Sequence, residues 1–241
     1  MTVTATDFRK RRFIVCASAL TIAATMVCGT PLASAQALFP AQLEWPQADP
    51  RAIPDVRLND VISAARQEAR QATQEARSSE RLAGQARRLT GLRSAIGRGP
   101  QLQTVGDGVV MSAVPYGDDG GAMFGELSWA NGAKLTGVVN NGMGEYEPAP
   151  ESSLRRFSGW VWGVTNPVPV PMRGEFEFRN GERFTGSYNA GSNASGVYVS
   201  ADGERRFVGE IDFEAGSYRP MRGQLEDRRG RVLAVVYVRQ P

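Results

Sequence analysis

The chain contains no histidine, and its two cysteines, Cys16 and Cys28, both lie within the first 28 residues. Beyond that segment it therefore has no Ser-His-Asp or Cys-His catalytic arrangement, no thiolate nucleophile and no zinc site built from His and Cys. It has no disulfide either, even in an oxidising compartment. Stability must come from packing and backbone hydrogen bonds, and we predict no catalytic, cofactor-binding or metal-binding residues.

The chain also lacks an apolar run long enough to cross a membrane. Its apolar run, residues 13–28, has 16 residues, whereas a spanning helix needs about 20. The run follows the basic residues 9–12 and precedes Ala-Ser-Ala, a signal peptidase pattern. We therefore expect residues 1–35 to be a secretory signal peptide cleaved after Ala35, which gives an exported, periplasmic protein. An uncleaved anchor and twin-arginine export are the alternatives.

The charge of the chain changes when this segment is removed. The four basic residues 9–12 and Asp7 leave with the signal peptide, so 28 basic and 25 acidic residues become 24 of each. The sequence pI of about 9.1 therefore belongs largely to the targeting segment. No nucleic-acid partner is indicated, and we expect contact with a membrane only through the signal peptide.

One long helix is expected after the signal peptide and a linker. Residues 36–57 hold four prolines and have no periodicity, which is typical of an extended linker. Residues 58–97 then predict a helix that is capped by Asn59 or Asp60 and ends near Thr90. Its apolar positions follow a 4-3 spacing and form a seam made mostly of alanine: Leu58, Ile62, Ala65, Ala69, Ala72, Ala76, Ser79, Ala83 and Ala86.

The alanine seam has more than one interpretation. It could join two copies of the chain in a coiled coil, giving a homo-oligomer through the helix. It could instead belong to a solvated spacer helix, because alanine is the best helix former. A third use is to cover a sheet, since the last segment, residues 232–238, is apolar on both faces of a strand.

Residues 100–241 are rich in glycine and contain short alternating runs. Three related segments occupy residues 124–139, 173–188 and 222–237. Their leading glycines are 49 residues apart: Gly125, Gly174 and Gly223. Each period holds two hairpins of about 24 residues, a length typical of stacked repeats. This predicts a mainly β fold with one long α-helix, in which an antiparallel sheet of consecutive hairpins follows the alanine-seam helix.

The register of these hairpins follows from the faces of the strands. A three-residue loop, residues 179–181, pairs Phe176 with Phe184 and keeps the apolar side chains on one face, with Gly181 as the left-handed residue. The same register pairs Leu127 with Leu135. It also sets Gly125 opposite Gly137 and Gly174 opposite Gly186, leaving a bare slot for an aromatic ring from the next hairpin.

The central copy has the pattern Gly-Glu-Phe-x-x-x-Asn-Gly-x-x-Phe-x-Gly-x-Tyr at residues 174–188. Gly-Val-Tyr follows at 196–198, Asp-Gly at 202–203 and Phe-x-Gly-Glu at 207–210. These residues resemble MORN repeats, over about residues 124–237. The stretch 160–171 interrupts the pattern, and the repeats are longer than the usual unit. The resemblance implies an elongated single-layer antiparallel sheet with roles in scaffolding, dimerisation or membrane-proximal attachment rather than catalysis.

Aromatic residues are the candidates for partner or ligand contact. Either they form the core of a thin sheet, or they form a platform for sugar rings or a peptide. The candidates are Trp129, Trp160, Trp162, Tyr188 and Tyr198. Trp160 and Trp162 are the best placed for exposure, because they are two residues apart in the stretch that interrupts the repeat.

Carboxylate pairs are the remaining chemical candidates. Glu145 with Glu147, and Asp118 with Asp119, could in principle serve a hydrolase, but both pairs lie near turns without an apolar pocket signal. We therefore expect an exported, non-enzymatic scaffold that binds a protein partner or an envelope surface. The second hypothesis is a module that binds envelope glycan or lipid headgroups through exposed tryptophans. The third is a carboxylate-based hydrolase.

Overall fold

The computed structural model describes residues 57–116, 121–188, 193–212 and 219–237, which all belong to one compact unit. The predicted signal peptide, its cleavage site after Ala35, almost all of the linker, and the pair Asp118 and Asp119 lie outside the described residues. No helix among the described residues is long and apolar enough to span a membrane.

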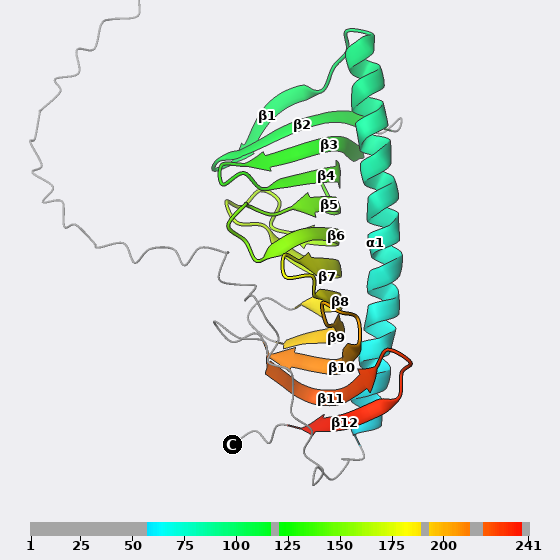
Figure 1. Ribbon diagram of the computed structural model, residues 1–241. Coiled ribbons are helices and arrows are strands. Elements are labelled where there is room, and N and C mark those ends of the chain that lie inside the picture. The colour runs from blue at the N-terminus through cyan, green and yellow to red at the C-terminus, as the bar shows by residue number, and fades with distance from the viewer. Residues whose placement is uncertain (1–56, 117–120, 189–192, 213–218, 238–241) are drawn as a thin grey trace, which may run out of the picture. The chain divides into compact units, whose positions relative to one another are not determined.

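The described residues form one helix and one sheet, which confirms the predicted fold class (Figure 1). The helix is α1 (Leu58–Ala95), and the twelve strands follow each other in chain order in one antiparallel sheet. The strands are β1 (Gln101–Gly106), β2 (Val109–Tyr116), β3 (Ala122–Trp129), β4 (Lys134–Val138), β5 (Met143–Glu147), β6 (Leu154–Trp162), β7 (Val170–Phe178), β8 (Arg183–Tyr188), β9 (Asn193–Val199), β10 (Arg205–Asp212), β11 (Arg219–Asp227) and β12 (Val232–Tyr237).

The predicted hairpin register is confirmed. Phe176 lies opposite Phe184, and Leu127 lies opposite Leu135. In the central hairpin the Phe178 amide donates to the Glu182 carbonyl at 2.9 Å, which closes a loop of residues 179–181. Gly181 has a φ of 89°, the left-handed conformation that this loop requires and that glycine adopts at low cost.

A row of glycines crosses the sheet from β3 to β11, and each member lies opposite the next. The row is Gly125, Gly137, Gly144, Gly159, Gly174, Gly186, Gly196, Gly209 and Gly223. A Cβ atom on Gly174 would stand 2.0 Å from the carbonyl oxygen of Ser158 on the neighbouring strand. Neighbouring backbones therefore approach closely along this line, and the two predicted facing pairs are part of a longer feature.

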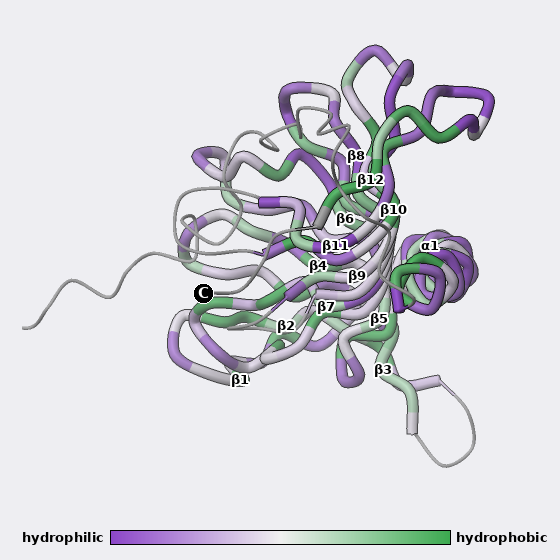
Figure 2. The backbone as a smooth tube through the Cα atoms, turned by 90° about the horizontal axis from the view of Figure 1, so that it is seen from below, coloured by the Kyte–Doolittle hydropathy of each residue, from purple (hydrophilic) through white to green (hydrophobic). Residues whose placement is uncertain are grey.

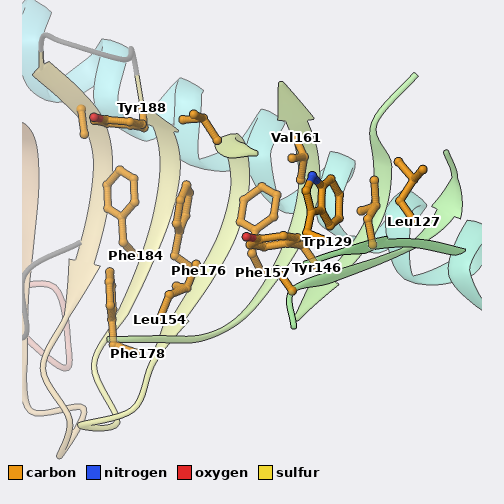
Figure 3. Packing of buried hydrophobic residues seen from close by; sticks show 14 of the residues in the cluster. Leu127, Trp129, Tyr146, Leu154, Phe157, Val161, Phe176, Phe178, Phe184 and Tyr188 are labelled. Carbon is orange, nitrogen blue, oxygen red and sulfur yellow. The ribbon is translucent and has the colours of Figure 1, made fainter. Parts of the chain in front are cut away.

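One face of the sheet, which we call the inner face, carries the large aromatic side chains. Figure 3 shows these side chains on the side of the strands away from α1. Phe157 lies over the row, because its ring atoms are 2.7 Å and 2.9 Å from where Cβ atoms on Gly159 and Gly174 would be. At Gly159 the ring comes from the same strand, two residues earlier, which differs from the expectation of a ring from another hairpin. At Gly174 the same ring does come from the neighbouring strand β6.

The opposite face, which we call the outer face, is covered along its length by α1 (Figures 1 and 2). The buried residues of the helix are the nine residues of the predicted seam. Ser79 in that seam donates from its Oγ to the carbonyl oxygen of Gly159 at 3.1 Å. Small side chains let helix and sheet backbones approach, so the seam is occupied within this chain rather than left free for a coiled coil.

The ends of α1 differ from the expectation. Neither Asn59 nor Asp60 caps the helix, which begins at Leu58 after Arg57 without a side-chain cap bond. The helix also continues past Gly91 to Ala95. Before Gly91, Leu82 and Leu89 pack with Phe124, Val114 and Val138 in one apolar cluster. The turn beyond Gly91 is largely exposed, and Arg93 donates from its side chain to the Pro115 carbonyl at 3.2 Å.

The last strand is covered on both sides only in its second half, because its first two residues are about half exposed. Val235 packs with Leu58 and Ile62 of α1 on the outer face. Val236, the next residue, belongs to the core cluster of the inner face. Covering both faces explains why this half of β12 does not show the alternation of a half-buried strand.

Candidate interaction surface

Trp160 and Trp162 are both exposed, at 37% and 51%, whereas Val161 between them is buried. Trp160 is paired with Arg173 of β7. Since Arg173 is ion-paired with Glu68 and Glu75 of α1, at 3.4 Å and 3.3 Å, this row lies on the outer face beside the helix. Side chains alternate along a strand, so Trp162 lies on the same face. We call Trp160 and Trp162 the tryptophan pair.

The position of the tryptophan pair within the sheet sets it apart from other exposed apolar side chains. The other large exposed hydrophobic residues in the described part of the chain lie at the two ends of the stack, in the end of α1, β1, β2 and β12: Leu92, Ile96, Leu102, Val110, Tyr116, Val232 and Leu233. The tryptophans lie in β6, in the middle of the stack. The end of a sheet exposes apolar groups because no further strand covers it, but that reason does not apply in the middle.

The other three predicted contact residues are core residues. Trp129, Tyr188 and Tyr198 are 4%, 2% and 0% exposed. The Tyr198 hydroxyl donates to Glu182 at 2.7 Å, so its polar end is satisfied inside the protein. These three side chains stabilise the inner face and are not available to a partner on the folded protein.

The stretch that interrupts the repeat serves two purposes. Residues 163–169 fold back toward β1 and β3, where the Trp129 indole donates to the Asn166 carbonyl at 2.9 Å. A Cβ on Gly106 of β1 would stand only 2.1 Å from the Thr165 carbonyl. Residues 163–169 therefore cover the core beside β1 and β3, whereas the tryptophan pair, which precedes them in the chain, stays exposed.

The described candidate carboxylates, Glu145 and Glu147, lie in different surroundings, and Glu145 links the helix to the sheet. Glu145 accepts hydrogen bonds from Arg87 of α1 and from Arg156, the latter at 2.7 Å. Glu147 is exposed at the end of β5. Among the residues that the structure describes, no group of three or more His, Cys, Asp or Glu side chains is placed to hold a metal ion.

The burial of two carboxylates could not be predicted from the sequence. Glu226 is 2% exposed and accepts from Arg66 of α1 at 2.6 Å, and Glu182 is 6% exposed. Both occupy positions in hairpins where a charged side chain is usually solvated. Only the tertiary arrangement shows that α1 brings an arginine to the first and that Tyr198 reaches the second.

Burial also acts on a tyrosine of the inner face. Tyr146 packs edge-on against Trp129, with 6.0 Å between the ring centroids. Removal from water raises the pKa of the Tyr146 hydroxyl well above its ordinary value, because the charged phenolate is disfavoured there. Its role is to fill the core, not to exchange protons at physiological pH.

Comparisons with family models, curated proteins and solved structures gave no match for this chain. The function therefore has to be argued from the surface itself. That surface offers two aromatic side chains with polar indole N–H groups, in the middle of a sheet held rigid by helix and core. Such groups suit contact with a protein surface or with sugar rings.

Proposed function

We propose that this chain is an exported, non-enzymatic scaffold of the MORN-repeat type, which binds a protein partner or an envelope component through the tryptophan pair. The observation that carries the proposal is the exposure of Trp160 and Trp162 in the middle of the stack. Tryptophan is enriched at interaction hot spots, where one large side chain supplies much of the contact area. The signal peptide pattern supports a setting in the cell envelope.

The architecture supports a scaffold rather than an enzyme. A hollow beside α1 is lined by charged side chains that pair with each other, such as Glu80 and Arg156. The inner face, where a repeat sheet could hold a ligand, is filled by its own aromatic side chains. This favours the outer surface beside the helix as the binding face.

A photo-crosslinking experiment in the producing cell tests the proposal. A benzoylphenylalanine at position 162 should give one discrete crosslinked product, since this side chain is half exposed at the proposed contact. The matched control carries the same probe at Gln85, on the exposed surface of α1. Loss of the product on adding Trp160→Ser supports the proposal. A product equally strong from position 85, or none from position 162, contradicts it.

A glycan ligand is the second candidate, because exposed tryptophans also stack on sugar rings. Soluble peptidoglycan fragments should then change the tryptophan fluorescence of the full chain, and Trp160→Phe with Trp162→Phe should abolish the change. An unchanged spectrum at saturating fragment concentration excludes this candidate. The crosslinked protein product would then stand as the function of this surface.

A further inference from the structure

A hollow of about 410 Å³ lies between α1 and strands β8 to β11 on the outer face. Arg66 and Arg70 of α1 and Arg206 of β10 line its rim, and we call it the arginine hollow. Its floor is apolar and includes Ala69 and Val208, whose side chains are only 9% and 2% exposed. The hollow therefore combines positive charge at its rim with an aliphatic base.

The charge of the arginine hollow is not balanced from within. Glu226 is the one carboxylate among its described lining residues, and it accepts from Arg66 at 2.6 Å and from Arg206 at 3.4 Å. Three guanidinium groups thus face a single carboxylate, which leaves two positive charges. A concave, low-dielectric wall concentrates such a field and attracts anions.

The arginines of the hollow also have N–H donors that no described residue accepts. A guanidinium carries five N–H donors, and Arg66 and Arg206 use few of them on Glu226. The Arg206 Nε atom is buried and has no acceptor among the described residues. A buried donor without a partner is rare in proteins, so the hydrogen bonds of the Arg206 guanidinium are not used up among the described residues.

The turn beside the hollow keeps Arg206 accessible. Gly230, at the turn between β11 and β12, has a φ of 80°, and a Cβ built on it would lie 3.4 Å from a terminal nitrogen of Arg206. A methyl group there would only touch the guanidinium group, so the turn conformation is what requires glycine, and the turn leaves Arg206 at the rim of the hollow.

We propose that the arginine hollow binds a carboxylate group carried on an aliphatic stem, presented by an acidic segment of a protein partner. The proposal rests on the scaffold function above and adds a second contact on the same face of the sheet. Planar guanidinium groups match a carboxylate in a two-pronged geometry, and Arg66 and Arg206 already donate one hydrogen bond each to Glu226. Val208 and Ala69 at the floor accept the apolar stem.

Fluorescence anisotropy with labelled peptides on the full chain tests this inference. The probe is an acetyl-Leu-Glu-Leu-amide peptide with a dye on a glycine linker, and its partner has Gln in place of Glu. We expect the acidic peptide to bind about 10-fold more tightly, as the loss of charge-assisted hydrogen bonds implies. Raising the NaCl concentration from about 0.05 to about 0.5 M should weaken it by screening the arginines.

Arg70→Gln is the test variant, because Arg70 is exposed and its side chain has no partner among the described residues. It should weaken the acidic peptide about 10-fold. Arg77→Gln, seven residues further along α1 and outside the hollow, makes the same charge change and should leave binding unchanged. Equal weakening by both variants, or equal binding of both peptides, overturns the proposal.

Hexanoate identifies the source of the carboxylate. If hexanoate competes as strongly as unlabelled acidic peptide, the hollow binds carboxylates but serves a free acid, which overturns the assignment to a protein segment. Much weaker competition by hexanoate supports that assignment. The crosslink from position 162 does not depend on these peptide and hexanoate measurements. A failure of the proposed function can therefore be distinguished from a failure of the arginine-hollow proposal.

Discussion

The two faces of the sheet are stabilised by opposite kinds of side chain. On the inner face the rings of Phe157, Phe176 and Phe184 lie next to each other, with centroid distances of 4.7 Å and 5.3 Å. On the outer face the contact is made by alanines of α1, such as Ala72 and Ala76, which are 0% and 1% exposed. Aromatic rings fill one side of the strands, whereas alanine methyl groups make the contact along the middle of the helix on the other side, with larger apolar side chains only toward its ends.

The difference shows what the glycine row permits. Without Cβ atoms, the row leaves space for rings such as Phe157 on the inner face. On the outer face the alanine seam brings α1 close to the strands, and flanking ion pairs such as Arg173 with Glu75 and Arg156 with Glu80 fix its position. Binding groups can then be presented beside the helix without weakening the core.

The largest effect is expected from shortening a ring on the inner face. Phe176→Ala removes a side chain that is 1% exposed between two other rings. It should reduce the free energy of unfolding by about 3–5 kcal/mol, measured by urea denaturation. The exposed Trp162→Ala is the control and should change it by less than about 1 kcal/mol. A smaller loss at Phe176 than at Trp162 would contradict the assignment of the core to this face.

A methyl group in the glycine row should have the next largest effect. Gly174→Ala places Cβ 2.0 Å from a backbone oxygen that cannot move aside, at a φ of 154°, and should destabilise the chain by about 3 kcal/mol.

Gly91→Ala is the matched change, since nothing lies within 4 Å of its Cβ position. It should stabilise the helix by about 0.5–1 kcal/mol. In thermal unfolding, we expect Gly174→Ala to lower the midpoint temperature and Gly91→Ala to raise it. Stabilisation by both variants would show that strands do not approach closely along the row.

A larger side chain in the alanine seam should cost less than a ring lost from the core. Ala72→Leu adds three carbon atoms where helix and sheet meet, and overpacking of this kind costs about 1–3 kcal/mol. The neighbouring Gln71→Leu points outward and should change stability by less than about 0.5 kcal/mol. Stability measured by chemical denaturation should fall in the first variant alone. Ala72→Leu at full stability would mean that the seam is not tightly packed.

The smallest effect is a pH dependence. The pKa of Tyr146 is raised by burial, so the unfolded chain releases this proton near its ordinary value of 10.0 while the folded chain keeps it. The contribution of Tyr146 to stability is therefore complete below that pH and falls as the pH rises above it. Tyr146→Phe should flatten this part of the stability curve. An unchanged slope would show that Tyr146 is not buried.

Much of this fold could be predicted because its signals are periodic and local. The 4-3 spacing of residues such as Ala65 and Ala69 identified all nine buried positions of α1, and the strand faces around Phe176 and Phe184 fixed the loop of the central hairpin. Gly144 was missed as a member of the row, because the hairpin around it has diverged from the repeat. The end of α1 was missed because Gly91 is a local signal for a helix end, whereas the last turn contacts the sheet through the bond from Arg93 to Pro115, which is distant in sequence.

The surface was predicted only in part. The spacing of Trp160 and Trp162 indicated a shared face and exposure, and both are exposed. The burial of Trp129 depends on a loop that folds back across the sheet to place the Asn166 carbonyl, which no local pattern encodes. The arginine hollow was missed for a similar reason, since Arg206 and Glu226 face each other across β10 and β11 but Arg66 joins them only through the packing of α1.

Native-state hydrogen exchange of the full chain tests most directly whether α1 belongs to the sheet. The amides of the seam, around Ala72 and Ala76, should be as strongly protected as those of Phe176 and Phe184, because helix and sheet open together. Phe176→Ala should then lower the protection of both by the same factor. An alanine-rich helix without tertiary support is marginally stable at best. Seam amides that exchange orders of magnitude faster than the strand amides would contradict the account.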